Sequence, residues 1–340
     1  MITVLQLAGG FVLLLFGAEF LVRGAVTVAR RLKVAPMIIG MTIVAYGTTS
    51  PELVVSLQAA FDNLPGISVG NVVGSNICNI LLILGLAALI FPIAVQPKLL
   101  YRDAAMMLGT ALLFAALAIS GTIERWQGGL MVAILAAFTL YAFRVERKKG
   151  RDNDPGDMAE ELAEEFQEGP KALWLALLSV AGGVVAVVTG AKLLVGAALV
   201  TARFFGVGEE VIGLTIVAVG TSLPELATAV VAAFRRHSDI AVGNIMGAGI
   251  YNLLMIMGVV GMVTPIPVPA QILAFDLWVM IAVTVMLLAF LLLRNGLSRP
   301  VGAMFLVLFA GYTTLQYYGV DNVMASLSQA TVSIGSAYAR

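Results

Sequence analysis

Residues 40–53 read GMTIVAYGTTSPEL, and residues 213–226 read GLTIVAVGTSLPEL. Ten of these fourteen positions are identical at a fixed offset of 173 residues, and no gap is needed to align them. The same offset places Asn79 on Asn252 and Asp103 on Asp276. Chance does not produce a match over so long a register, so the chain is built from two copies of one unit.

The composition indicates the class of protein that carries this repeat. Of 340 residues, 60% are hydrophobic and 12% are charged, whereas an ordinary soluble domain has roughly 45–50% and about 25%. Twenty basic and twenty acidic residues cancel, so the overall charge predicts no nucleic-acid partner. The single histidine and single cysteine exclude a zinc site of clustered His and Cys ligands. The sequence therefore predicts a membrane protein with little room for an extramembrane enzyme.

Apolar runs between polar or Gly/Pro breaks predict ten membrane-spanning helices, because about 20 apolar residues cross a hydrocarbon core of about 30 Å. The predicted spans are 3–22, 36–61, 67–91, 103–120, 126–143, 172–200, 209–234, 240–264, 271–293 and 300–318. The predicted fold class is therefore an all-α polytopic membrane protein.

The repeat divides these spans into two units of five helices. We expect a first repeat at 1–143 with its motif at 40–85, a cytoplasmic loop at 144–171, a second repeat at 172–318 with its motif at 213–258, and a C-terminal tail at 319–340. Because five is an odd number, the second unit must enter the membrane from the side opposite to the first. Inverted repeats of this kind are typical of secondary transporters, whose site near the membrane midplane opens to either side in turn.

The distribution of basic residues predicts the orientation. With the N-terminus outside, the inner segments hold 16 Lys and Arg residues, the outer segments hold only Arg125, Arg203 and Arg340, and Lys192 lies within a span. Basic residues are enriched in loops on the cytoplasmic side of a membrane. We therefore expect a multi-pass protein of the plasma (inner) membrane with both termini outside.

Each copy of the motif predicts a broken helix near the middle of the membrane. Pro51 has no N–H, so the carbonyl of Gly47 loses its helical donor, and Pro224 acts in the same way on Gly220. Carbonyls freed at membrane depth are tolerated only where protein, water or an ion satisfies them. Further oxygens beside the breaks come from the hydroxyls of Thr48, Thr49, Thr221 and Ser222.

A carboxylate follows each break, at Glu52 and at Glu225. A charge at the bilayer centre is costly and is usually functional. No neighbouring span carries a basic residue in its core, so protons or bound cations must neutralise both groups. Amides follow in the next spans at Asn79 and Asn252, and Ser75 shares a helix face with Asn79. Carboxylates, hydroxyls, amides and carbonyls together form the all-oxygen donor set that hard cations prefer.

At these residues the sequence resembles the calcium/cation antiporter superfamily, in the prokaryotic type of its sodium/calcium exchanger branch. The cores Gly-Thr-Thr-Ser-Pro-Glu and Gly-Thr-Ser-Leu-Pro-Glu are similar to the sodium-coupled pattern rather than the proton-coupled one. The resemblance covers essentially all ten spans and implies a secondary active antiporter that exchanges Na+ for Ca2+ by alternating access. It also implies a packed core of the spans within 36–91 and 209–264, with those at 3–22 and 172–200 sliding against it.

The resemblance also implies the ligands of the transported ions. Glu52 and Glu225 would bind Ca2+ and Na+ in turn at the centre of the site. The other ligands would be the hydroxyl or backbone oxygens of Thr48, Thr49, Thr221 and Ser222, the backbone carbonyls of Ala45 and Ala218, and the side-chain oxygens of Ser75, Asn79 and Asn252. Two positions depart from the family pattern, because many prokaryotic relatives carry Ser and Asp where this chain has Ala248 and Asn252.

Three other functions fit part of the pattern. Oxygen ligands alone do not fix the size of the cation, so an antiporter of Mg2+, Mn2+ or K+, or a proton-coupled Ca2+ exchanger, is the leading alternative. A cation channel would share the repeats without coupling two fluxes. An intramembrane enzyme would need a duplicated Asp pair at mid-membrane depth, which the sequence lacks.

We expect no enzyme activity and no prosthetic group. The expected partners are Ca2+ and Na+ as transported ligands and the lipid bilayer as surroundings, with no nucleic acid. The expected functional unit is a monomer.

Overall fold

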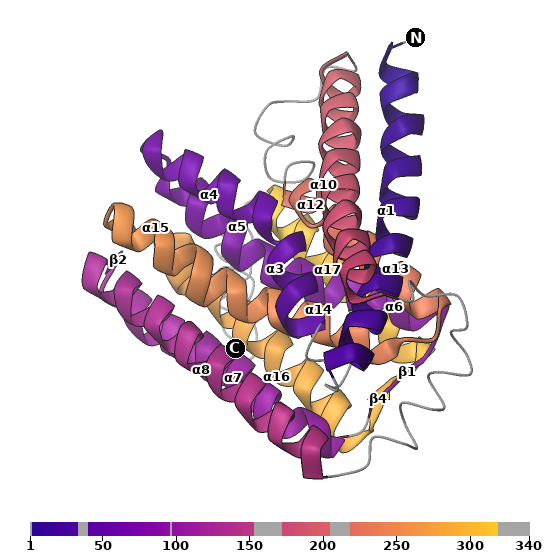
Figure 1. Ribbon diagram of the computed structural model, residues 1–340. Helices are drawn as coiled ribbons and strands as arrows, with labels where there is room; N and C mark the ends of the chain where they lie inside the picture. The colour runs from indigo at the N-terminus through magenta and orange to yellow at the C-terminus, as the bar shows by residue number, and fades with distance from the viewer. Residues whose placement is uncertain (1, 33–39, 96, 153–171, 205–217, 319–340) are drawn as a thin grey trace, which may run out of the picture.

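The computed structural model describes residues 2–32, 40–95, 97–152, 172–204 and 218–318. Each of the ten predicted spans contains helix within these residues, as can be followed in Figure 1. Outside the described residues lie most of the predicted loop, at 153–171, the tail at 319–340, and parts of two predicted spans, at 36–39 and 209–217.

The first half of the chain folds into helices joined by short turns and by π-helical segments, which are labelled η. Its elements are α1 (Ile2–Leu32), η1 (Gly40–Val44), α3 (Ala45–Thr48), α4 (Ser50–Phe61), α5 (Pro65–Cys78), η2 (Asn79–Leu84), α6 (Gly85–Ile90), β1 (Ile93–Ala94), α7 (Pro97–Ala118), β2 (Thr122–Ile123) and α8 (Arg125–Asp152).

The second half follows a similar order. Its elements are α10 (Leu173–Phe204), α12 (Ala218–Thr221), α13 (Leu223–Phe234), α14 (Ser238–Tyr251), η4 (Asn252–Ile256), α15 (Met257–Val263), β3 (Ile266–Pro267), η5 (Ile272–Asp276), α16 (Leu277–Leu293), β4 (Gly296–Leu297) and α17 (Arg299–Tyr318).

Several of these helices have the length and composition of membrane spans. Among the described residues, the six that are long and apolar enough are Ala8–Val28, Pro65–Ile90, Leu100–Ala118, Leu173–Leu193, Ser238–Val263 and Ile272–Leu293. The shorter helix α13 is apolar as well. The chain is therefore a multi-pass helical membrane protein.

Helices α1 and α10 pack side by side and stand at a steep angle to most of the other helices in Figure 1. Glycines form their contact. A Cβ on Gly190 would lie 2.7 Å from the carbonyl oxygen of Gly10, and one on Gly183 would lie 2.8 Å from that of Gly17. The two backbones therefore touch directly, as in small-residue helix pairs of membrane proteins. The offset of 173 relates Gly10 to Gly183 and Gly17 to Gly190, so the two contacts are equivalent.

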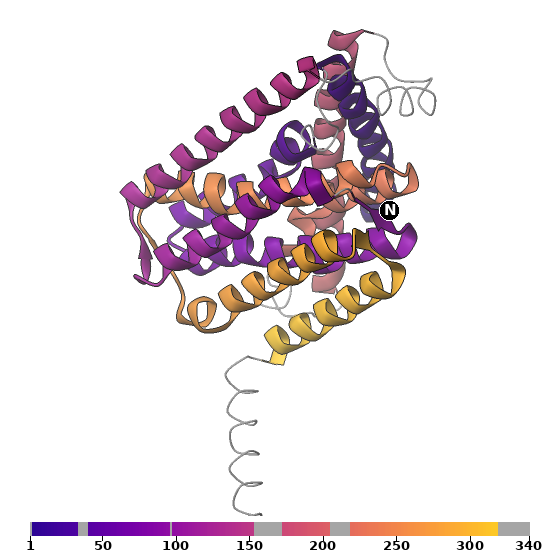
Figure 2. The ribbon, with the colours of Figure 1, turned by 90° about the horizontal axis from the view of Figure 1, so that it is seen from below.

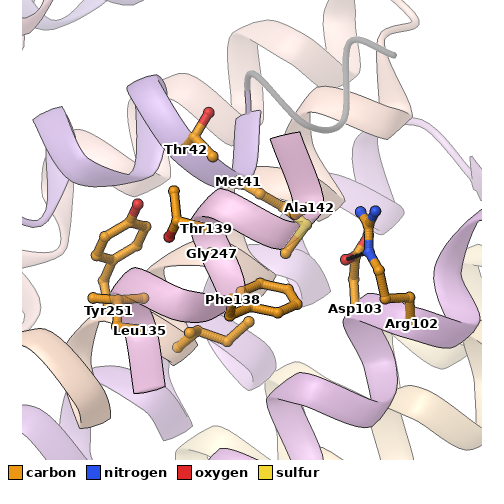
Figure 3. Close-up of a pocket in the computed structure, with 11 residues that line it drawn as sticks. Met41, Thr42, Arg102, Asp103, Leu135, Phe138, Thr139, Ala142, Gly247 and Tyr251 are labelled. Atoms are coloured by element: carbon orange, nitrogen blue, oxygen red, sulfur yellow. Dashed lines mark hydrogen bonds and ion pairs between the residues drawn. The ribbon is translucent and has the colours of Figure 1, made fainter. Parts of the chain in front are cut away.

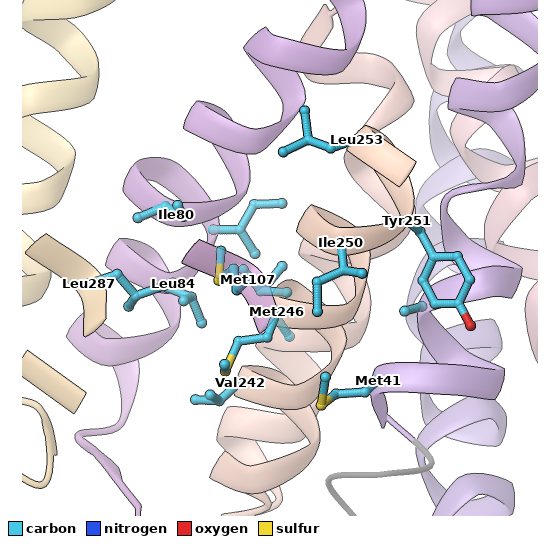
Figure 4. Close-up of a cluster of buried hydrophobic side chains, with 14 of the residues drawn as sticks. Met41, Ile80, Leu84, Met107, Val242, Met246, Ile250, Tyr251, Leu253 and Leu287 are labelled. Atoms are coloured by element: carbon cyan, nitrogen blue, oxygen red, sulfur yellow. The ribbon is translucent and has the colours of Figure 1, made fainter. Parts of the chain in front are cut away.

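Helix α14 lies at the centre of the packed core and is buried along nearly its whole length. Figure 4 shows Val242, Met246 and Ile250 of this helix among apolar side chains from neighbouring segments. Helix α8 packs on α15, and α17 packs on α6. Figure 2 places α8 and α17 on opposite sides of the bundle. The two halves of the chain thus meet around α14 rather than forming separate bodies.

Two pairs of very short strands join the halves at their turns. β1 pairs with β4 and β2 pairs with β3, both antiparallel. Position 296 must be glycine, because its φ is 147° and a Cβ there would lie 1.9 Å from the carbonyl oxygen of Ile93. Strands of two residues are too short to produce a recognisable sequence pattern, so the sequence does not predict them.

Several helices run beyond the predicted spans, and two of them do so through a basic segment. α1 continues past residue 22 to Leu32, and α8 continues past residue 143 to Asp152. The basic side chains in these extensions end the apolar run, but Arg and Lys are good helix formers and do not end the helix. The predicted ends at 22 and 143 mark where the apolar runs stop, and the helices themselves end later.

Candidate functional site

Both predicted helix breaks are present, with nearly the same backbone geometry. Thr49 adopts φ −81° and ψ 2° between α3 and α4, and Pro51 lies in the first turn of α4. Ser222 adopts φ −87° and ψ 7° between α12 and α13, and Pro224 lies in the first turn of α13. At each of these residues one helix ends and the next begins, so the prediction of two broken helices is confirmed. The proline that follows lacks the N–H that would continue the preceding turn.

The carboxylates Glu52 and Glu225 lie in the first turns of α4 and α13. Both residues are 0% exposed, and the two are close enough to interact electrostatically. No described basic side chain forms an ion pair with either of them. The N-terminus of each helix carries a partial positive charge, which offsets only part of the two negative charges.

Several buried polar atoms at the site, including three of the four carboxylate oxygens, make no hydrogen bond within the protein. Ser222 Oγ donates to Glu52 Oε1 over 3.4 Å, but Glu52 Oε2 and both Glu225 oxygens have no partner. The side-chain amides of Asn79 and Asn252 are also buried without partners. A buried polar group left unpaired costs about 1–3 kcal/mol, so such groups are normally bonded. The unpaired oxygens are the surroundings that a bound cation requires.

Two π-helical segments position the amides. η2 begins at Asn79 and packs against α13, whereas η4 begins at Asn252 and packs against α4. The segment that each amide opens therefore packs on the helix that carries the carboxylate of the other half. π-Helical segments within α-helices occur frequently at functional sites.

Ser75 on α5 connects the two halves at the site. This residue is buried, and its Oγ lies 3.4 Å from Ser222 Oγ. Ser222 of the second half thus contacts both Glu52 and Ser75 of the first, and the structure brings these three predicted residues together. The position that matches Ser75 in the second half is Ala248, which is buried and has no hydroxyl.

The hydroxyls of the first break bond partly to their own backbone. Thr49 Oγ1 donates to the carbonyl oxygen of Ala45 over 2.7 Å, and Thr48 Oγ1 lies 3.3 Å from the same oxygen. The Thr49 N–H also donates to it over 2.9 Å. The predicted ligands Thr49 and Ala45 therefore satisfy each other in this structure, which the sequence did not predict. Ala218, the other predicted carbonyl ligand, is the first residue of α12.

The donor set fits a hard cation rather than a resident transition metal. Within the part of the chain that the structure describes, no group of three or more His, Cys, Asp or Glu side chains is placed to hold a metal ion. Two carboxylates surrounded by neutral oxygens can bind a hard cation such as Ca2+ reversibly.

Comparison with known proteins identifies the family. A model of the sodium/calcium exchanger protein family matches residues 2–144 and 175–318, which is most of the chain. The chain belongs to the sodium/calcium exchanger family. It is therefore an exchanger-type antiporter and not an enzyme.

The exchanger is similar to several proteins along most of its length. It is 34% identical over 356 residues to the sodium/calcium exchanger MaX1 of Methanosarcina acetivorans, with 94% of this chain and 100% of the relative covered. It is 36% identical over 276 residues to the inner membrane protein YrbG of Escherichia coli, with 81% and 84% covered. A solved structure of the sodium-calcium exchanger NCX_Mj, soaked with Na+ and Sr2+, matches with a TM-score of 0.78 and 28% identity, over 91% of this chain and 96% of that one.

Two further amides of the exchanger, which the sequence analysis left outside the site, bridge its halves. Thr221 Oγ1 donates to Asn71 Oδ1 over 3.3 Å, and Thr48 Oγ1 donates to Asn244 Oδ1 over 3.3 Å. The signal that could have found them is the sequence Val-Gly-Asn, which ends at each of these two amides and recurs at the offset of 173.

A small pocket lies elsewhere in the exchanger, between η1, α7, α8 and α14 (Figure 3). Its charged lining consists of Arg102 and Asp103, whose side chains form an ion pair with a distance of 2.7 Å. Arg102 therefore compensates the charge of Asp103. The uncompensated charge that marks the candidate site is found at the two glutamates and not in this pocket.

Proposed function

We propose that the chain is a Na+/Ca2+ antiporter that binds the two ions in turn at one site centred on Glu52 and Glu225. The observation that carries this proposal is the pair of fully buried carboxylates whose oxygens are largely unpaired. Such a pair is stable at membrane depth only when cations or protons neutralise it. The family and the name of the relative MaX1 support Na+ and Ca2+ as the cations.

In the proposed site both halves contribute ligands to one ion. Ca2+ takes roughly 6–8 oxygen ligands, and the two carboxylates supply the charge that balances one Ca2+. The neutral ligands are the oxygens of Thr48, Thr49, Thr221, Ser222, Ser75, Asn79 and Asn252, with the backbone carbonyls of Ala45 and Ala218.

The same charges explain how the two ion fluxes are coupled. If the site closed while empty, two unneutralised carboxylates would be held away from water, which costs several kcal/mol for each ion. With Ca2+ or Na+ bound, this cost is largely removed. The site therefore closes and reopens to the other side only when loaded, so one ion must replace the other.

The proposed architecture is ten membrane crossings in two inverted repeats, at 1–143 and 172–318, linked by a cytoplasmic loop at 144–171. Contacts that recur between equivalent positions support it. The glycine contacts of α1 with α10 form one such pair, and the strand pairs β1–β4 and β2–β3 form another. Two equivalent halves around one site allow it to be exposed to either side in turn.

The proposed location is the plasma membrane, with both termini outside and a monomer as the functional unit. The excess of Lys and Arg in the segments assigned to the inside supports this orientation.

The test is uptake of 45Ca2+ into proteoliposomes that contain the purified protein and are loaded with Na+. Liposomes loaded with K+ or choline serve as controls, and a further set carries only a proton gradient. We expect uptake that requires internal Na+ and that stops when an added ionophore dissipates the Na+ gradient.

Each other outcome contradicts a defined part of the proposal. Uptake driven only by the proton gradient would replace Na+ by protons as the coupling ion. Uptake that is equal in all liposomes would indicate a channel, and absence of Ca2+ flux would exclude Ca2+ as the substrate.

A further inference from the structure

When the oxygen of a threonine hydroxyl binds a cation, the hydroxyl proton must be donated in a hydrogen bond to another group. The oxygen binds the cation through a lone pair, and the hydroxyl has only one proton to donate. Next to a carboxylate, the strongest acceptor for that proton is the carboxylate itself. A hydroxyl that donates to the carboxylate occupies one of its roughly four lone-pair sites, and it thereby competes with the cation for the negative charge.

The hydroxyl proton and the cation would compete for a carboxylate at both helix breaks. The side chain of Thr48 is close enough to the carboxylate of Glu225 to interact with it, and the side chain of Thr221 is close enough to the carboxylate of Glu52. Each threonine therefore lies beside the carboxylate of the other half.

The structure provides a second acceptor for each of these protons. Asn71 Oδ1 accepts from Thr221 Oγ1, and Asn244 Oδ1 accepts from Thr48 Oγ1, each over 3.3 Å. All four side chains are buried. At the offset of 173, Thr48 corresponds to Thr221 and Asn71 corresponds to Asn244. The same hydrogen bond therefore occurs twice, each time between one half and the other. For Thr48, the carbonyl of Ala45 is another acceptor at 3.3 Å that is not a carboxylate.

Other contacts fix the amide of Asn71 in this orientation. Its Nδ2 donates to Ser56 Oγ over 3.0 Å and to the backbone carbonyl of Glu52 over 3.3 Å. With the NH2 group directed at these acceptors, Oδ1 must face Thr221. The same amide thereby links the turn that carries Glu52 to the hydroxyl beside its carboxylate.

The second half lacks part of this support. The residue at the offset from Ser56 is Ala229, which has no hydroxyl, and Asn244 Nδ2 has no hydrogen-bond partner. Asn244 therefore lacks the contact that anchors the NH2 group of Asn71, although it makes the same bond to a threonine.

We propose that Asn71 and Asn244 are positioning residues that accept the hydroxyl protons of Thr221 and Thr48 across the boundary between the halves. This leaves the hydroxyl lone pairs and the carboxylate oxygens available to the transported cation. The inference rests on the proposed function, because it assigns these threonines as ligands.

Two double-mutant cycles test this pairing. Asn71→Leu and Thr221→Val are made singly and together, and so are Asn244→Leu and Thr48→Val. Equilibrium binding of 45Ca2+ to the purified protein gives the Ca2+ affinity, and the Na+ concentration that halves this binding gives the Na+ affinity. Elution profile and melting temperature show whether each variant is folded.

If the asparagines act through the threonines, their effects depend on the threonine being present. We expect Asn71→Leu alone to weaken Na+ binding by about 3- to 10-fold, the range for one hydrogen bond. In the Thr221→Val background the same change should have an effect of less than about twofold. The crossed combinations, Asn71→Leu with Thr48→Val and Asn244→Leu with Thr221→Val, are the matched controls, and their effects should multiply.

The outcomes separate this inference from the proposed function. Normal binding by the unmodified protein, with effects that multiply in all combinations, would overturn the inference alone. Failure of the unmodified protein to bind Ca2+ or Na+ would overturn the proposed function and this inference with it.

A gain of function provides a second measurement in which no side-chain group is removed. Ala229→Ser introduces at the second half the hydroxyl that Ser56 supplies in the first. We expect it to strengthen Na+ binding by about 2- to 5-fold, as one added hydrogen bond would, and to have no effect when Asn244→Leu is also present. An equal effect with and without Asn244 would contradict the assigned role.

Discussion

The two halves of the molecule have the same backbone at the site but different side chains around it. The residues at the breaks, Thr49 and Ser222, differ by only a few degrees in φ and ψ. The first half carries hydroxyls at Ser75 and Ser56, whereas the second has Ala248 and Ala229 at the equivalent positions. Proline and glycine fix the course of the chain in both halves, while the lining is free to vary. The site is therefore symmetric in charge and asymmetric in neutral ligands.

The charge symmetry predicts the largest effects. Glu52→Gln and Glu225→Gln should each lower Na+-dependent 45Ca2+ exchange by at least about 100-fold, because removing one partner from a buried charged site costs about 3–5 kcal/mol. Asp62→Asn, which alters an exposed carboxylate at the end of α4, is the control and should retain exchange. Normal exchange in either glutamine variant, measured in proteoliposomes, would show that the two carboxylates do not have equivalent roles.

The contact of α1 with α10 predicts the next largest effect. Gly183→Ala should destabilise the protein by about 1–3 kcal/mol, the usual cost of overpacking, because its Cβ would lie 2.7 Å from the backbone nitrogen of Leu21. Gly190→Ala tests the equivalent contact and should have a similar effect. Gly182→Ala is the matched control, since a Cβ there meets nothing within 4 Å. Equal melting temperatures for all three variants in detergent would show that the glycine contact does not matter.

The difference in hydroxyls predicts smaller effects of opposite sign. Ser75→Ala should weaken Na+ binding by up to about 10-fold, the loss expected for one polar contact, because it makes the first half resemble the second. Ala248→Ser should strengthen Na+ binding by a smaller factor. Both are measured as the Na+ concentration that halves 45Ca2+ binding. The same sign for both substitutions would mean that the two positions do not have equivalent roles.

An ion pair between α1 and the end of α13 predicts the smallest effect. Glu19 accepts hydrogen bonds from Arg23 and Arg235, whereas the equivalent positions in the other half, Lys192 and Asp62, carry the opposite charges. Partly exposed ion pairs contribute about 0–1 kcal/mol, so Arg235→Gln should change the exchange rate by less than about fivefold. Because Arg23 also pairs with Glu19, the reversed set is Glu19→Arg with Arg23→Glu and Arg235→Glu, and it should restore the rate. Failure of the reversal would show that the charges do not act on each other.

The sequence alone predicted the features that depend on residue type and spacing. The breaks follow from Pro51 and Pro224, and the buried charges follow from Glu52 and Glu225, which recur at one offset. Contacts between the halves could not be predicted, because they depend on how two distant segments pack. The bond from Thr221 to Asn71 is one such contact.

Some local details also depended on three-dimensional structure. The sequence showed a hydroxyl at Thr49 but not that it bonds to the carbonyl of Ala45 in its own helix. The predicted spans at 3–22 and 126–143 rest on hydropathy. The apolar runs stop at basic residues, whereas helices α1 and α8 continue past them. The two-residue strands have no periodicity to recognise, and only the φ of Gly296 reveals the turn that they require.

The length of α1 has a consequence for the lipids around the protein. Its 31 residues form a helix of about 46 Å, at about 1.5 Å per residue, whereas the hydrocarbon layer is about 30 Å thick. The exposed aromatic side chains of Phe11, Phe16 and Phe20 lie along this helix, and Trp174 is exposed on α10. The apolar stretch of α1, Ala8–Val28, has 21 residues, which is about 32 Å, so this stretch matches the hydrocarbon layer and the rest of the helix extends beyond it. In a bilayer with shorter or longer acyl chains this match would be lost, and α1 would have to tilt or the lipid would have to change its thickness, each at a cost in free energy.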